Sequence, residues 1–187
     1  VSNAVTVDDS LVDNASLTVS LSSNTPLARQ IVATQGSNRD EIWDVEIAKL
    51  NAKATGDKVQ ITDWQVTITQ TANSNTGDPT TVYLVDDSTG TTIGTAALAA
   101  VSGTVYAGTF TDIDTWVNKD STRTFSLRVK ATALDNLGLT SFGASTTGGA
   151  VTAENGEGST VAPSGTASTS AVIFAIDDGL EISLVGT

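Results

Sequence analysis

The alternation of apolar and polar residues is clearest between residues 41 and 71, and this stretch predicts the centre of the fold. In its first half, Trp43, Val45 and Ile47 alternate with polar or small residues, which is typical of a strand with one buried face. In its second half, the apolar phase shifts by one residue at Thr62, which indicates a β-bulge. A polar turn joins the two halves, so we interpret the stretch as a long β-hairpin.

The predicted core combines the in-phase residues of this hairpin with those of a second strand, residues 121–133. Tryptophans in phase with Val and Ile on long strands are usually core residues. The predicted core residues are Trp43, Val45, Ile47, Trp64, Val66, Ile68, Phe125, Leu127 and Val129. Trp116 lies in a short connector, and we expect it to be the most exposed of the three tryptophans.

Short strand-like segments separated by turn residues account for the rest of the chain. They are residues 15–21, 30–33, 81–85, 91–98, 103–110, 171–176 and 180–185. Residues 135–170 are rich in Gly, Ser, Thr and Ala, and we interpret them as long loops around short edge strands. No stretch has helical periodicity. The pattern predicts a single antiparallel, Ig-like β-sandwich of about ten strands with negligible helix, spanning residues 14–187 after an N-terminal extension, residues 1–13.

Composition excludes several kinds of chemistry. The 187 residues contain no Cys, His or Met, so there is no thiol nucleophile, histidine base or typical Zn, Cu or haem ligand set. The net charge of −12 disfavours nucleic acid and anionic membrane surfaces as partners. No run of 18 apolar residues is present, so we expect no membrane span.

Acidic residues recur in pairs along the chain. The pairs are Asp8 with Asp9, Asp40 with Glu41, Asp86 with Asp87, Asp112 with Asp114, and Asp177 with Asp178. Carboxylates suit Ca²⁺, but no twelve-residue calcium loop is present, and such clusters are also ordinary turn residues. We favour the turn interpretation over a Ca²⁺ site and over a carboxylate-based glycosidase. The protein is therefore expected to be no enzyme and to need no cofactor.

Several segments together resemble a known family. They are LTVSLSSNTP at 17–26, the long hairpin that follows, TVYLVDDSTGTTIGTA at 81–96, GTFTDID at 108–114 and TRTFSLRVKA at 122–131. This set resembles the β-sandwich domains of secreted cell-surface proteins of Patescibacteria and similar bacteria. The resemblance implies an Ig-like fold, export and an extracellular location, and it carries over no catalytic residue. The chain begins at Val1 without a methionine. We expect an exported form whose signal peptide has been removed, although a sequence that starts at an arbitrary point looks the same.

These observations favour a structural subunit of an extracellular filament or surface array, with copies of the same chain as partners. The N-terminal tract carries its own apolar pattern through Val5, Val7, Leu11 and Val12. We expect it to complete a sheet of a neighbouring subunit by strand donation, the alternative being an ordinary edge strand of its own domain.

Two other classes of function remain open, a glycan- or cell-binding adhesion module and, less favoured, a secreted enzyme. An aromatic platform of the three tryptophans with Tyr83 and Tyr106 would suit a glycan. Asn14 begins the single N-x-S/T sequon and is a candidate glycosylation site. Lys49 could form an isopeptide bond, but we favour a solvated lysine there.

Overall fold

The computed structural model describes residues 14–72, 77–134, 140–170 and 173–176, which form fifteen strands and one short 3-10 helix. The elements are β1 (Ser16–Leu21), β2 (Arg29–Val32), β3 (Ile42–Thr55), β4 (Val59–Ala72), β5 (Asp78–Asp86), β6 (Thr91–Ala97), β7 (Ala99–Ser102), β8 (Val105–Phe110), β9 (Thr115–Val117), β10 (Thr122–Thr132), β11 (Thr140–Thr147), η1 (Gly148–Ala150), β12 (Val151–Asn155), β13 (Thr160–Val161), β14 (Ser164–Ser168) and β15 (Ile173–Ile176).

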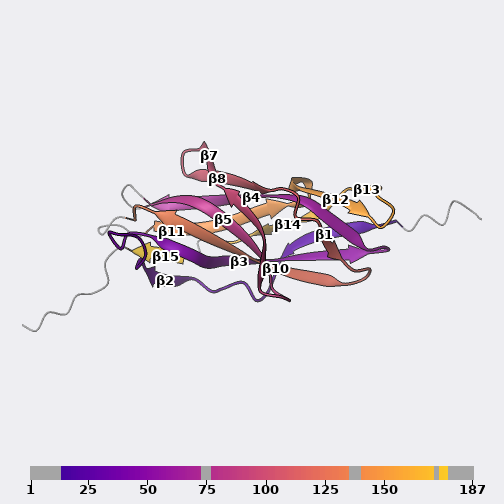
Figure 1. Cartoon of the computed structure of the whole chain (residues 1–187), viewed down its shortest axis with the longest axis horizontal. Coiled ribbons are helices and arrows are strands. Elements are labelled where there is room, and N and C mark those ends of the chain that lie inside the picture. Colours follow the sequence, from indigo (N-terminus) through magenta and orange to yellow (C-terminus); the bar gives the residue numbers. More distant parts are fainter. Residues whose placement is uncertain (1–13, 73–76, 135–139, 171–172, 177–187) are drawn as a thin grey trace, which may run out of the picture.

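The strands form an elongated β-sandwich (Figure 1). One layer has the order β6-β5-β10-β3-β1. The other is built around β4, which pairs with β8 and β9 along one edge and with β11 and β12 along the other. β14 joins the layers along one side, because it pairs with both β1 and β11. The all-β sandwich with negligible helix is confirmed, with more strands than the ten expected and with two parallel pairs, β1–β14 and β2–β15.

The predicted hairpin of residues 41–71 is wrong in its pairing. The two long strands exist, but β3 pairs with β1 and β10, whereas the described partners of β4 are all strands of the other layer. The turn that joins them therefore crosses from one layer to the other, and their apolar faces meet across the core. Alternation shows which face of a strand is buried, but not which strand lies beside it.

The bulge predicted at Thr62 is confirmed. Along the β12–β4 ladder, Thr152 pairs with Asp63 and the next residue pairs with Ile61, so Thr62 has no partner. This extra residue moves the apolar phase of β4 by one position. As a result both Ile61 and Trp64 point into the core, and both are completely buried.

Most of the predicted core residues are buried. Those with at most 1% exposure are Ile47, Trp64, Val66, Ile68, Phe125, Leu127 and Val129, and Val45 is partly buried against them. The prediction for Trp43 is wrong, because its side chain is 50% exposed. The cause is an irregularity at Asp44, whose φ of +55° is left-handed, next to a register shift against β10. The irregularity changes the phase, so Ile42 rather than Trp43 points inward.

The interpretation of residues 135–170 as loops around edge strands is also wrong. β11 is a central strand between β4 and β14, and all but two of its residues are buried. Its hydroxyls find partners inside the sandwich: Thr146 Oγ1 accepts the indole N–H of Trp64 at 2.9 Å and donates to the carbonyl of Gln65. Small residues thus pack and hydrogen-bond inside the sandwich in a segment where loops around short edge strands were expected.

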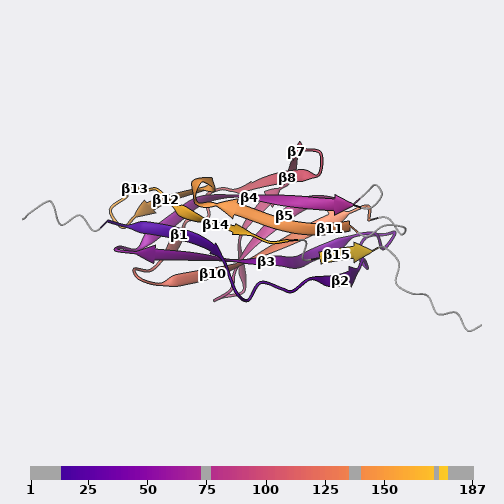
Figure 2. The ribbon, with the colours of Figure 1, turned by 180° about the vertical axis from the view of Figure 1, so that it is seen from behind.

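The two ends of the sandwich are formed by different strands. β1 begins at one end of the long axis, where Asn14 lies against Gly56 at the far end of β3 (Figure 1). At the opposite end lie β2, β15 and the start of β3 (Figures 1 and 2). A two-residue bridge between Gln35 and Glu41 joins β2 to β3 there. The described chain therefore enters the molecule at one end and leaves β15 at the other.

Candidate functional site

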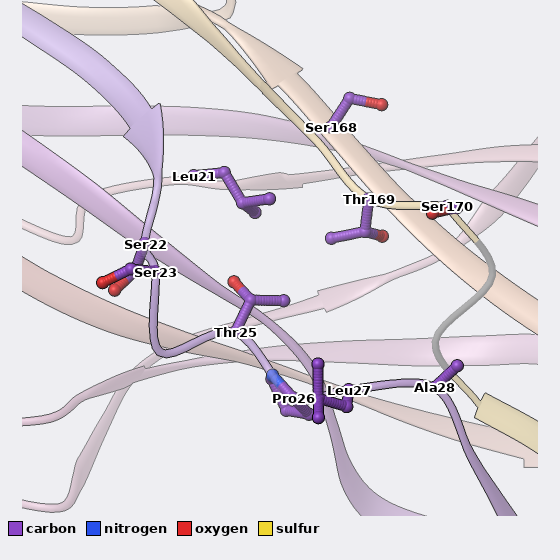
Figure 3. Close-up of a pocket in the computed structure, with 10 residues that line it drawn as sticks. All are labelled: Leu21, Ser22, Ser23, Thr25, Pro26, Leu27, Ala28, Ser168, Thr169 and Ser170. Atoms are coloured by element: carbon purple, nitrogen blue, oxygen red, sulfur yellow. The ribbon is translucent and has the colours of Figure 1, made fainter.

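A pocket of about 390 Å³ opens where the first and last strands of the sandwich separate (Figure 3). Its walls come from the segment between β1 and β2 and from the segment after β14. The lining residues are Leu21, Ser22, Ser23, Thr25, Pro26, Leu27, Ala28, Ser168, Thr169 and Ser170. None of these ten side chains is ionisable and six carry hydroxyls, so the pocket offers no acid, base or charged ligand.

The pocket exists because two neighbouring lines of strand, β1 followed by β2 and β14 followed by β15, are each interrupted at the same position along the long axis. β1 pairs in parallel with β14, and β2 pairs in parallel with β15, but the segments between them diverge (Figure 3). On one side, Thr169 bridges the interruption, because its hydroxyl accepts from the Ala144 N–H and its own N–H donates to the Ala144 carbonyl, both at 2.8 Å. On the other side the chain turns at Pro26, which cannot continue a ladder.

Among the described residues, the divergence of β2 leaves the first half of β3 without a paired strand along its outer edge. Near Lys49, the segment that follows β1 contacts this edge: Ser22 N–H donates to the Lys49 carbonyl, and the Thr25 hydroxyl accepts from the Lys49 N–H at 3.1 Å. At Glu46, the guanidinium of Arg29 donates to the carbonyl at 3.3 Å. The Thr25 and Arg29 side chains thus make hydrogen bonds that the backbone of a neighbouring strand would otherwise make. We call residues 42–48 of β3 the open edge.

Exposed apolar side chains gather around the open edge. Four large hydrophobic residues of the described chain are exposed, and three of them, Leu27, Val32 and Trp43, lie on the segment from the pocket to the start of β3. The bridge between Gln35 and Glu41 brings Val32 and Trp43 to the same end of the molecule. Three of the four exposed large apolar side chains thus lie on one segment, and such clustering is typical of an interaction surface.

Trp43 is held by charged neighbours. Lys130 lies 4.7 Å from the centre of the indole ring, and the indole N–H donates to Glu41, which also pairs with Lys130 at 3.6 Å. Trp116, expected to be the most exposed tryptophan, is half-buried, with Lys58 4.6 Å from its ring centre. Among the aromatic side chains that the structure describes, Trp43 is the one that a partner can reach most readily.

Lys49 lies in an ion-pair network on the outer face of β3. Its Nζ is 2.6 Å from Asp87 and 3.8 Å from Glu46, and the Ser126 hydroxyl on the intervening strand lies within hydrogen-bond distance of both carboxylates. The hydrogen bond to Asp87 raises the pKa of Lys49, so the amine is protonated at neutral pH. A protonated amine is not a nucleophile, which disfavours an isopeptide bond at Lys49.

Asp86 is the most deeply buried acid of the described chain and has a structural role in a turn. Arg123 Nη2 lies 2.8 Å from its carboxylate, and the Ser88 N–H and the Ser88 and Thr89 hydroxyls donate to it. The Arg123 guanidinium lowers the pKa of Asp86 far below its usual value; burial opposes the shift, and the bonds from Ser88 and Thr89 add to it. For this pair the turn interpretation of the acidic residues holds.

We predict that this carboxylate makes stability depend on pH in acid. Because the pKa of Asp86 is lower in the folded than in the unfolded chain, its stabilisation is complete above about pH 4, the unfolded value. It is lost progressively as pH falls below that value. Urea unfolding of an Asp86→Asn variant should therefore show a stability deficit at pH 7 that shrinks toward pH 2. Asp44→Asn, which removes the exposed partner of Arg128, is the control; an Asp86→Asn deficit that stayed constant with pH would contradict the assignment.

The remaining predicted sites are only partly within the described residues. Asn14 is exposed, as a glycosylation site requires. The donor residues Val5, Val7, Leu11 and Val12 lie outside the described residues, as do the acidic pairs at 8–9 and 177–178. Among the residues that the structure describes, no three His, Cys, Asp or Glu side chains group as metal ligands, and no helix is long and apolar enough to cross a membrane.

Comparison with known proteins gives only distant likenesses. No family model and no curated protein matches the chain. Among solved structures, it is similar to the major pilin subunit BcpA of Bacillus cereus (14% identity, TM-score 0.33), covering 72% of this chain and 36% of the pilin. The chain thus spans about a third of that pilin. A cohesin module of a Clostridium perfringens family 33 glycoside hydrolase (14% identity, TM-score 0.33) is covered to 99%, over 88% of this chain.

A third similar structure comes from the fibronectin-binding AAF fimbriae of enteroaggregative Escherichia coli (10% identity, TM-score 0.28), with 87% of this chain and 99% of that chain covered. At such TM-scores the likenesses assign no function, which has to be inferred from the chain's own geometry. The resemblance to surface domains of Patescibacteria stays a prediction.

Proposed function

We propose that the protein is a structural subunit of an extracellular filament or surface array, assembled when residues 1–13 of one copy add a strand to the next. The observation that carries the proposal is the placement of Asn14 and the open edge at opposite ends of the long axis (Figures 1 and 2). A strand that leaves one end of each copy meets a free sheet edge at the other end of its neighbour.

The geometry favours a linear polymer. A contact between two different surfaces of the same molecule generates an open chain unless the rotation closes a ring. Thirteen extended residues reach about 43 Å, close to the length of a fourteen-residue strand such as β3. The donated tract is therefore long enough to cover the open edge while its own sandwich stays outside the neighbour. No catalytic step and no bound cofactor are part of this proposal.

Removal of the tract tests it. A chain without residues 1–13 is expected to stay a folded, soluble monomer, because in this proposal the tract pairs with a neighbouring copy and not with its own sandwich. The full chain should form fibres visible by negative-stain electron microscopy. A matched control replaces Val5 and Val7 by Asp, which keeps the length but removes the apolar phase, and it should block fibres equally. Fibres from the shortened chain, or its unfolding by circular dichroism, would reject strand donation.

A second candidate function is glycan or cell binding, favoured by the half-exposed indole of Trp43. Sugars stack on exposed aromatic rings, although Lys130 already contacts this one. Binding on a glycan array that is lost with Trp43→Ala and kept with Trp116→Ala would favour the adhesion module over the filament subunit.

A further inference from the structure

The described sheets have several edge strands, which differ in length and in how well the core beside them is covered. β13 has two residues, β7 has four exposed residues, and β6 packs against β8, where Gly94 and Gly108 allow close approach. The open edge of β3 is longer than β7 and β13. It also borders a part of the core that is only partly covered, because Leu21, Ile31 and Val45 around it are partly buried.

Few hydrogen bonds replace those that a neighbouring strand would make with the backbone of the open edge. The Arg29 guanidinium occupies one carbonyl, and the ladder with β1 ends at Leu50, followed by the contacts of Lys49 with the β1–β2 segment. A row of unpaired N–H and C=O groups on a sheet edge is satisfied when an extended segment adds to it. An added strand here would continue the line of β1 toward the end of the molecule.

Two basic residues flank this edge. Arg29 and Arg39 flank it, on β2 and in the turn before β3, and within the described part of the chain neither has a carboxylate at ion-pair distance. Residues 1–13 contain three aspartates and no basic residue. The acids on the edge, Asp44 and Glu46, are paired with Arg128 and Lys49. The two arginines therefore remain to attract the aspartates of the tract.

We propose that residues 42–48 of β3 are the acceptor edge, and that the occupant is the tract of residues 1–13 from a second copy. This inference rests on the proposed strand donation and adds where the strand docks. The direction follows from the geometry, because the donor copy lies beyond the end where β3 begins. Its tract therefore enters with residue 1 innermost and runs antiparallel to β3, as β1 does. The apolar phase of Val5 and Val7 then faces the partly covered core around Val45.

The absence of cysteine from the chain allows a direct test. One full-length chain carries Thr6→Cys, in the phase opposite to Val5 and Val7, and the other carries Trp43→Cys or Glu46→Cys on the open edge. Control chains carry Thr92→Cys on β6 or Thr160→Cys on β13. After mild oxidation of mixed chains, the disulfides are separated by non-reducing gel electrophoresis and identified by mass spectrometry.

The expected result is a mixed disulfide to the open edge at about tenfold or more the yield of either control, because docking raises the local thiol concentration. Equal yields, or a higher yield with Thr92→Cys or Thr160→Cys, would overturn the acceptor assignment while fibres still supported strand donation. Loss of strand donation itself would appear separately, as fibres that persist without residues 1–13. An Arg29→Glu, Arg39→Glu variant gives a second readout, since it should slow fibre growth most at low salt.

Discussion

Replacing Trp64 by alanine is expected to lower the free energy of unfolding by about 3–5 kcal/mol. The side chain is completely buried, packs edge-on against Phe125 of the opposite layer with ring centres 5.6 Å apart, and donates to Thr146. Removal leaves a cavity between the layers and takes the indole donor away from the Thr146 hydroxyl, which keeps its own bond to the Gln65 carbonyl. Urea unfolding followed by circular dichroism measures the loss.

Trp43→Ala is the matched control, because it removes the same side chain from a half-exposed site on the facing strand. Its loss should stay within about 1 kcal/mol, the contribution of an exposed cation–π contact. Equal losses for the two tryptophans would show that both are core residues, and would contradict the outward orientation of Trp43 that follows from the irregularity at Asp44.

Gly165→Ala is expected to cost about 3 kcal/mol or more, by opening the side of the sandwich where β14 meets β1. Gly165 has a φ of +88°, and a Cβ there would lie 2.2 Å from the Val19 carbonyl oxygen of the paired strand. A backbone atom in a ladder cannot move aside without breaking the ladder. The parallel β1–β14 pair should separate, and the melting temperature should fall accordingly.

A control separates the steric cost from backbone strain. Gly90 has a φ of +70° in the β5–β6 turn, and no atom lies within 4 Å of where its Cβ would be. Gly90→Ala should therefore cost only about 1 kcal/mol, from the left-handed backbone alone. If Gly165→Ala were no worse than Gly90→Ala, close contact between β14 and β1 could not be what excludes a side chain there.

Sequence patterns predicted the faces of strands better than their neighbours. The bulge at Thr62 was visible because apolar residues on both sides mark the phase change. The irregularity at Asp44 was hidden, because Trp43 is apolar and fits the alternation even though it points outward. The crossing of the chain between β3 and β4 leaves no mark in alternation, since a turn between layers and a turn within a layer use the same polar residues.

β11 escaped prediction for a different reason. Its buried positions hold Ser, Thr, Gly and Ala around a single Phe142, and such residues become core only when hydrogen bonds and close packing are supplied by tertiary structure. The open edge was equally invisible, because an edge is defined by a strand that is missing. The signals that were available are Pro26, which ends a ladder, and the apolar Leu27 beside it.

The parallel pairing of the first and last strands has a mechanical consequence. A pull between Asn14 at one end of the sandwich and Ile176 near the other acts along β1 and β14, and along β2 and β15, in opposite directions. Parallel neighbours pulled from opposite ends are loaded in shear, so their slanted hydrogen bonds must break together instead of one after another. Tension along the long axis thus loads the molecule in a direction in which these two ladders resist rupture as a group.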